Sequence, residues 1–455
     1  MKNTKRSMII CVIVLLLSVI FLNAEIQAAT LEVGVGKPYT TIQSAINAAN
    51  SEDTVLVYDG TYVENIQPAI NAAINLDKAI TVKSVNGAAS TIIDANRSGA
   101  VVYMKSGEID GFTIQNGRSR GISCVSGSPS VKNCIITGTV TQVINFGVDI
   151  GVSSASFINC IITGNGSATA FAGGGVSCGG AASPSFINCI ISSNTGGVYY
   201  GKASGAGMYI FNNSSPAIIN CTITNNYAAD SYLPEAGGIH CERTSSPIVV
   251  NSIIWGNTAG GLPSEICVDE TSTINLTYSD IQGGWIGTGN IDANPLFIGG
   301  GDYHLQANSP CIDKGTSSGA PDYDIDGNTR PYGASDDMGA DEYMSSTLIA
   351  LSSFTANPYN QKVILSWTTE SEIDNAGFNL YRSETENGNY TKINFSLIPA
   401  NGSSTQGASY EHIDKNVQNR KTCWYKLEDI DINGTSTMHG PKSATPRWLF
   451  GIFKK

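Results

Sequence analysis

The stretch Ser183–Asn194, which reads SPSFINCIISSN, has two close copies in the same chain. SASFINCIITGN ends at Asn165, and SPAIINCTITNN ends at Asn226. An Asn-Cys pair therefore recurs between apolar residues at intervals too long for a single helix or hairpin. Self-similarity with a period of roughly 20–50 residues is the signature of a repeat architecture, so this stretch decides the fold.

Three positions recur along the repeat. The first is the asparagine before the cysteine, at Asn133, Asn159, Asn188, Asn220 and Asn251, with Ser252 replacing the last cysteine. Successive spacings are 26, 29, 32 and 31 residues, and a degenerate earlier copy contains Asp110-Gly111. The second is a small polar residue six positions later, at Asn116, Thr139, Asn165, Asn194, Asn226 and Asn257. The third is a short run that ends at Cys124, Ile150, Cys178, Ile210 and Cys241.

Each unit thus holds three short apolar runs, separated by Gly, Ser-Pro or Asn. Alternation with a period of two predicts strands, and the separating residues predict corners. A single unit has no partner for its apolar face, so the units must stack. Three strands per turn in a parallel stack make a β-helix, and the fold class is all-β.

On this repeat, residues 54–290 resemble the right-handed parallel β-helix proteins of the pectin-lyase-like fold. Before them, KPYTTIQSAINAAN places Ile42, Ala45, Ile46 and Ala49 at helical spacing. This spacing predicts an amphipathic helix that caps the first coil. The β-helix with its N-terminal helical cap is expected over residues 30–293.

Stacking explains the recurring Asn-Cys pair. Equivalent residues of successive coils lie about 4.8 Å apart, which is the spacing of neighbouring strands. Asparagine tolerates a left-handed corner, and its amide bonds both the backbone and the next asparagine in the stack. The cysteines are expected to form an inward column of free thiols, because side chains stacked in register do not point at each other. This column comprises Cys134, Cys160, Cys189 and Cys221.

Two further regions follow the repeats. Residues 294–345 contain DYHLQANSPCIDKG, DYDIDGNTRP and DMGADEY, and resemble the choice-of-anchor segment that closes many bacterial β-helix proteins. Residues 352–446 contain KVILSW and KTCWYKLEDI, and resemble a fibronectin type III-like antiparallel β-sandwich. This resemblance implies a module that spaces or attaches.

The start of the chain has the pattern of an export signal. Basic residues between Lys2 and Arg6 precede the apolar run Met8–Leu22, and small residues follow. Residues 1–28 are therefore predicted to be a signal peptide, and no later segment is apolar enough to span a membrane. We expect a secreted, periplasmic or cell-surface protein. The formal net charge of −12 argues against nucleic acid as a partner.

One strand face carries the candidate site, because the long connections border it. If the third run ends on inward residues, alternation turns their preceding neighbours outward, including Ser123 and Ser177. The candidate catalytic residues are Asp149, Tyr209, His240 and Glu242. The candidate substrate-binding residues, chosen for aromatic faces and carboxylates, are Tyr199, Tyr200, Phe211, Tyr227, Asp230, Tyr232 and Glu235. For each single residue, the alternative is a solvated face whose tyrosines cover apolar surface.

An acidic motif supplies the candidate metal ligands. DYDIDG, at Asp322–Gly327, has the spacing that begins an EF-hand loop, but Gly333 stands where the loop needs a bidentate glutamate. Asp322, Asp324 and Asp326 are the candidate Ca²⁺ ligands, and the alternative is a solvated acidic turn. No cofactor is required by the sequence, and Ca²⁺ is the candidate that it suggests.

The motifs of known enzymes of this fold are absent from the sequence. Pectate lyases pair Ca²⁺-binding aspartates with an arginine base, and polygalacturonases and pectin methylesterases carry their own acidic motifs. The favoured function is therefore binding of extracellular polysaccharide or a cell-surface glycan, or surface attachment, through the β-helix face. One alternative is a polysaccharide lyase or glycoside hydrolase with a non-standard active site there, and another is a structural spike. The oligomeric state stays open.

Overall fold

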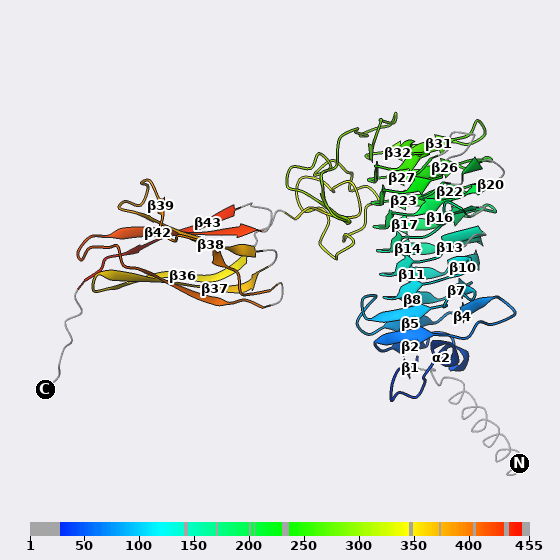
Figure 1. Ribbon diagram of the computed structural model, residues 1–455, viewed down its shortest axis with the longest axis horizontal. Coiled ribbons are helices and arrows are strands. Elements are labelled where there is room, and N and C mark those ends of the chain that lie inside the picture. Colours follow the sequence, from blue (N-terminus) through cyan, green and yellow to red (C-terminus); the bar gives the residue numbers. More distant parts are fainter. Residues whose placement is uncertain are drawn as a thin grey trace, which may run out of the picture. The chain divides into compact units, whose positions relative to one another are not determined.

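The computed structural model describes residues 28–140, 144–169, 172–199, 202–203, 205–229, 236–344, 349–372, 375–403, 406–431 and 436–447. The chain divides into two compact units, with the boundary between Met344 and Ser345 (Figure 1). Except for Ala28, the predicted signal peptide lies outside the described residues. Within the described part, no helix has the length and apolarity to cross a membrane. The finer division into residues 30–293, 294–345 and 352–446 stays a prediction.

The first unit is a parallel β-solenoid built from three long sheets (Figure 1). The ten-stranded sheet contains β1 (Thr30–Val33), β2 (Thr54–Val57), β5 (Thr81–Ser84), β8 (Glu108–Asp110), β11 (Ser130–Lys132), β14 (Ser156–Ile158), β17 (Ser185–Ile187), β23 (Ala217–Ile219), β27 (Ile248–Val250) and β32 (Asn275–Thr277). The nine-stranded sheet contains β3 (Gly60–Val63), β6 (Thr91–Asp94), β9 (Thr113–Gln115), β12 (Ile135–Thr137), β15 (Ile161–Thr163), β18 (Ile190–Ser192), β24 (Thr222–Thr224), β28 (Ile253–Trp255) and β33 (Asp280–Ile281).

The eight-stranded sheet forms the third wall and carries the predicted functional face. It contains β4 (Ala72–Leu76), β7 (Ala100–Met104), β10 (Arg120–Gly127), β13 (Ile144–Ser153), β16 (Ala172–Cys178), β22 (Met208–Ile210), β26 (Ile239–Cys241) and β31 (Ile266–Val268). Short strands lie in the connections that border this wall: β19 (Thr195–Gly196), β20 (Val198–Tyr199), β21 (Lys202–Ala203), β25 (Tyr227–Ala228), β29 (Thr258–Ala259) and β30 (Leu262–Pro263). The all-β parallel solenoid predicted from the repeat is therefore confirmed.

The strand register confirms that equivalent residues of successive coils stand in single file. Phe157 pairs with Phe186, which pairs with Ile218, one coil after another. The rings of Phe157 and Phe186 stack inside the solenoid at 5.0 Å. The asparagines that follow these strands share a left-handed backbone with φ between 49° and 53°, as the sequence predicted: Asn133, Asn159, Asn188, Asn220 and Asn251. We call this file the outer ladder.

The second polar position forms an inner ladder, which comprises Thr139, Asn165, Asn194, Asn226 and Asn257. The Asn165 amide donates to Asn194 Oδ1 at 3.2 Å, and the Asn194 amide donates to Asn226 Oδ1 at 3.0 Å. Each amide also donates to a backbone carbonyl, as from Asn194 to Ile162 at 2.9 Å. Buried amides must find such partners, so the inner ladder ties every coil to its neighbours.

A column of glycines makes room for the inner ladder. A Cβ atom on Gly147 would lie 2.6 Å from the amide nitrogen of Asn165, and one on Gly175 would lie 2.8 Å from that of Asn194. Only glycine, which has no Cβ atom, leaves room for the side-chain amides of the inner ladder at these positions. In the last coil Glu265 precedes β31, and its carboxylate accepts hydrogen bonds from the Asn257 side chain at 2.5 Å and backbone at 3.1 Å. Glu265 thus ends the ladder in place of a further asparagine.

The cysteine column is also present. Its four members are buried, and the ten cysteines that the structure describes are all free. Serines continue the column, because the Cys221 amide donates to Ser252 Oγ at 3.1 Å and the Ser252 amide donates to Ser279 Oγ at 3.0 Å. Burial raises the pKa of Cys134, Cys160 and Cys189, and so holds these three thiols in the unreactive protonated form.

The N-terminal cap is the predicted helix. It is α2 (Ile42–Ala48), with Thr41 as its N-cap and Ile42, Ala45 and Ile46 buried against the first coil. The buried Glu64 carboxylate accepts a hydrogen bond from the Ile42 amide at 2.5 Å and so holds the helix start.

Residues 294–344, here called the closing segment, lie along the outer ladder rather than across the solenoid end (Figure 1). Apart from the hairpin of β34 (Phe297–Gly299) and β35 (Asp302–Leu305), the segment is irregular. Three ladder amides donate to its backbone carbonyls. They are Asn188 to Tyr323 at 2.6 Å, Asn220 to Asp337 at 3.2 Å, and Asn251 to Thr316 at 2.7 Å. The segment therefore docks on the flank of the last coils.

The second unit is an antiparallel β-sandwich. One sheet contains β36 (Ile349–Tyr359), β37 (Lys362–Glu372) and β41 (Ser409–Asp414), and the other contains β38 (Asn375–Ser383), β39 (Thr391–Lys392), β40 (Ile398–Pro399), β42 (Cys423–Asp431) and β43 (Ser436–Ala444). Trp367 stacks on Tyr410 at 5.1 Å and meets Phe378 edge-on at 5.4 Å in the core. This is the sandwich that the sequence predicted.

The inner ladder predicts a large cost for Asn194→Ala. The substitution removes the acceptor of the buried Asn165 amide groups, so we expect a loss of about 2–4 kcal/mol of stability. Cysteine labelling during urea unfolding reports on the β-helix, because its interior holds the thiols. The control Asn159→Gly keeps a left-handed corner on the outer ladder and should cost about 1 kcal/mol or less. Equal losses in the two variants would contradict a dominant inner ladder.

The ladder end predicts a pH dependence. Burial raises the pKa of Glu265 to about 7, above its value in the unfolded chain. Stability from this group is therefore complete below pH 4.5 and is lost as the pH rises through 7. The same labelling assay gives the free energy of unfolding at pH 5 and at pH 8. The difference between these two values should be smaller in Glu265→Gln than in the unaltered protein. An unchanged difference would show that Glu265 does not titrate in this range.

Candidate functional site

The predicted row of outer residues exists on the eight-stranded sheet. Register pairs join Ser123 to Asp149, Asp149 to Ser177, Ser177 to Tyr209, and Tyr209 to His240. The row continues downward through Tyr103 to Asn75 and upward to Cys267. A continuous file of side chains therefore runs along the wall.

This face is less open than the alternation predicted. Ser123, Ser177, His240 and Glu242 are all buried. The connection before β22 covers part of the row, since a Cβ atom on Gly205 would lie 2.8 Å from the His240 Cβ. Alternation fixes which way a side chain points, whereas the long connections decide whether solvent reaches it.

An aromatic cluster occupies the upper part of the row. The rings of Tyr209 and Phe211 stack at 4.6 Å and 15°, and the Tyr209 ring meets the His240 ring at 5.4 Å. Phe211 lies flat over Gly179 of the preceding coil, where a Cβ atom would come within 2.5 Å of the ring. Tyr209 and Phe211 are half-buried, so their rings are held in place and still reach solvent.

The carboxylates of the face are paired with neighbours. The Tyr209 hydroxyl donates to Glu242 Oε1 at 2.6 Å, and Arg243 Nε lies 3.1 Å from the same oxygen. Arg120 Nε donates to Asp149 Oδ2 in a second ion pair. The predicted catalytic residues Tyr209, His240 and Glu242 thus come together, whereas Asp149 pairs separately.

Asp149 and Glu242 are too far apart to act as a catalytic pair. Asp149 lies in β13 and Glu242 directly follows β26, three strands away in the sheet, which corresponds to about 14 Å at the usual strand spacing. The two carboxyl groups of a glycoside hydrolase are separated by roughly 5–10 Å. This geometry does not fit a two-carboxylate hydrolase with these residues.

The remaining predicted contacts lie in the bordering connections. Tyr227 is exposed in β25, beside the neighbouring strands β19 and β29. Tyr199 belongs to β20, but its side chain is not described. Tyr200, Asp230, Tyr232 and Glu235 lie outside the described residues.

The predicted metal ligands Asp322, Asp324 and Asp326 differ in their surroundings. Asp324 is buried, and its carboxylate accepts hydrogen bonds from the Asp326 and Asn328 amides at 2.9 and 2.7 Å and from the Glu342 amide at 3.0 Å. These bonds use both of its oxygens to hold the turn. Asp322 is exposed, and Asp326 faces His304 at 2.7 Å instead. The spacing of residues within the motif could not reveal that backbone amides already donate to both carboxylate oxygens of Asp324.

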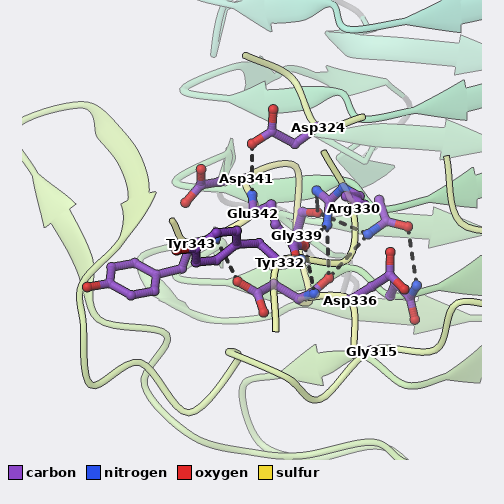
Figure 2. A network of polar contacts seen from close by, with 12 residues as sticks. Gly315, Asp324, Arg330, Tyr332, Asp336, Gly339, Asp341, Glu342 and Tyr343 are labelled. Carbon is purple, nitrogen blue, oxygen red and sulfur yellow. Dashed lines mark hydrogen bonds and ion pairs between the residues drawn. The ribbon is translucent and has the colours of Figure 1, made fainter. Parts of the chain in front are cut away.

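A buried ion pair sits in the centre of the closing segment (Figure 2). Arg330 and Glu342 meet at 2.7 Å with both side chains fully buried. Arg330 also donates to the Gly339 carbonyl at 3.0 Å, and Glu342 accepts from the Asp337 amide at 2.9 Å. Burial raises the pKa of Asp337 to about 7 and raises the pKa of Glu342. The network holds the closing segment together, and the Asn220 side chain of the solenoid also donates to the Asp337 carbonyl at 3.2 Å.

Comparison with known proteins supports the architecture. The family described as "Right handed beta helix region" matches residues 98–263 and, in a second match, residues 175–287. Residues 98–287 thus form a right-handed β-helix repeat region. The second unit of this β-helix protein has two antiparallel sheets. A solved structure described as that of a Fn3-like protein from Clostridium thermocellum is 16% identical, with a TM-score of 0.16. The similarity covers 23% of this chain and 96% of that chain. No curated protein matches the β-helix protein.

Breaking the buried pair should loosen the closing segment. Glu342→Gln leaves Arg330 buried without its counter-ion, and we expect a cost of about 3–5 kcal/mol. Labelling of Cys311, which is buried in the same segment, should become faster in native buffer. The matched control is Arg243→Ala, which removes the exposed cation of an ion pair outside the closing segment and should leave Cys311 labelling unchanged. Equal labelling in both variants would contradict a stabilising role for the buried pair.

Proposed function

We propose that this β-helix protein is exported and binds extracellular polysaccharide or a cell-surface glycan on its eight-stranded sheet. The observation that carries the proposal is the stacked Tyr209–Phe211 pair beside the Glu242 carboxylate. A surface or carbohydrate-interacting role also fits a β-helix with an Fn3-like region. Fold alone does not assign function, so the argument is made from this cluster.

The cluster has the chemistry that a sugar ring needs. Aromatic side chains offer large flat surfaces at low conformational cost, and Tyr209 and Phe211 are already fixed by their mutual stacking and by Gly179. The Tyr209 hydroxyl and the Glu242 carboxylate add polar groups that sugar hydroxyls can bond. Because the rungs repeat along the wall, a polymer of repeated rings matches this surface better than a single compact ligand.

The charge pattern favours binding over lyase chemistry. A lyase that acts on a uronate needs a free cation for the substrate carboxylate, but Arg120 and Arg243 are each paired with a carboxylate of the protein. The distance between Asp149 and Glu242 argues likewise against a hydrolase. No cofactor is required for binding, and Ca²⁺ bridging of an acidic glycan is a further expectation to be tested in the same assay. A secreted, periplasmic or cell-surface location is part of the proposal.

A glycan array with the purified protein tests the proposal. We expect retention of one polysaccharide class without product release, and at least about fivefold weaker binding by Phe211→Ala and Tyr209→Ala, since a buried aromatic contact contributes more than about 1 kcal/mol. Phe395→Ala is the matched control, because it removes a fully exposed aromatic ring from the sandwich.

Three outcomes separate the alternatives. New reducing or unsaturated ends that vanish in Tyr209→Phe or His240→Ala would replace the binding proposal with an enzyme. Retention that is unaffected by Phe211→Ala would show that the polysaccharide binds to another surface of the protein. Absence of retention across the panel, with and without Ca²⁺, would leave a structural spike as the function.

A further inference from the structure

A second cluster lies in the closing segment, away from the aromatic face. His304 comes from β35, Asp326 comes from the turn after Tyr323, and Asp341 lies near the end of the segment. One potential ligand atom from each of these three residues lies within 4.8 Å of the other two. Among the described residues, this is the one group of three or more such side chains that converge in this way.

The histidine ring is oriented by a fourth residue. Asp302 accepts a hydrogen bond from the His304 backbone at 3.0 Å and bonds its Nδ1 atom. The opposite atom, Nε2, therefore faces Asp326 at 2.7 Å. A carboxylate that holds one imidazole nitrogen while the other faces acidic groups is the arrangement that supports histidine as a metal ligand.

Asp341 gives an independent indication. Its side chain is only 8% exposed, and one of its carboxylate oxygens, Oδ2, accepts a hydrogen bond from the Leu305 amide at 2.9 Å. The Asp341 carboxylate contributes to the cluster with His304 and Asp326. In Figure 2 the carboxylate lies apart from the Arg330–Glu342 pair. A buried carboxylate that a backbone amide holds in place is positioned to act as a metal ligand.

We propose that His304, Asp326 and Asp341 bind a divalent transition-metal ion of the Zn²⁺ class, with Asp302 as the positioning residue. Imidazole nitrogen combined with two carboxylates suits Zn²⁺ and Mn²⁺, whereas Ca²⁺ takes oxygen ligands. The ion would join β35, the turn after Tyr323 and the end of the segment. Its effect is independent of glycan binding, because the aromatic face shares none of these residues.

Calorimetric titration of the full, tag-free chain with ZnCl₂ tests this site. We expect one ion per chain, loss of that binding in His304→Ala, and about 10–100-fold weaker binding in Asp302→Asn. His412→Ala removes a histidine from the sandwich and should bind as the unaltered protein does. CaCl₂ should bind more weakly than ZnCl₂ at the same site. Labelling of Cys311 should slow on addition of Zn²⁺ in the unaltered protein and not in His304→Ala.

The competing explanation is an ion pair in which a protonated His304 bridges Asp302 and Asp326. Under that explanation no saturable 1:1 Zn²⁺ binding occurs, and that result overturns the proposal. Binding that persists in both His304→Ala and Asp341→Asn would overturn it as well, by placing the ion elsewhere. Circular dichroism of each variant shows whether the fold is kept, and Asp341→Asn serves as the second variant if His304→Ala unfolds.

Discussion

The need of a buried amide for hydrogen-bond partners governs this β-helix. In each rung of the inner ladder, one asparagine side chain donates to the next asparagine and to a backbone carbonyl, as Asn226 does with Asn257 and Ile191. The amide can reach both only if the wall beside it lacks a Cβ atom, so the glycine column follows from the ladder. Coil length is free to vary only where these contacts are not made, which confines the insertions to the connections beside the eight-stranded sheet. The last rung has no successor, and Glu265 supplies the acceptors instead.

The outer ladder shows a second use of the same residue type. Its lower rungs bond one another, as Asn188 does with Asn159 at 3.1 Å. At the upper rungs the amides also donate to backbone carbonyls of the closing segment. Asn251 still donates to Asn220 at 3.2 Å, whereas no bond links Asn188 to Asn220 among the described residues. An irregular segment with its own buried ion pair can dock there because the ladder offers donors at a regular spacing. The closing segment therefore covers the outer-ladder corner in the upper coils. The eight-stranded sheet remains available for contacts with other molecules.

Both candidate sites arise where the repeat is broken. Tyr209 and Phe211 replace the small residues Ser177 and Gly179 of the preceding coil, and the larger rings stack because residues two apart point to the same face of the sheet. In the closing segment His304, Asp326 and Asp341 converge from separate stretches that share no periodicity. The regular rungs make the solenoid rigid, whereas the residues of the candidate sites lie where the sequence departs from the repeat. Compensation of charge within each site, such as Arg243 with Glu242, favours recognition over turnover.

Period, corner residues and alternation were sufficient to predict the parallel solenoid, its cap helix, the outer asparagine file, the thiol column and the sandwich, because each depends on local geometry and on the spacing between strands. The same reasoning predicted the row Asp149, Tyr209 and His240, since register carries one residue onto the next. Only the tertiary structure decided that connections bury much of this row, and that Asp149 and Glu242 stand three strands apart. It also placed the closing segment on the flank and brought His304 and Asp341 close to Asp326. Those results depend on contacts between segments far apart in the chain, and sequence spacing holds no record of such distances.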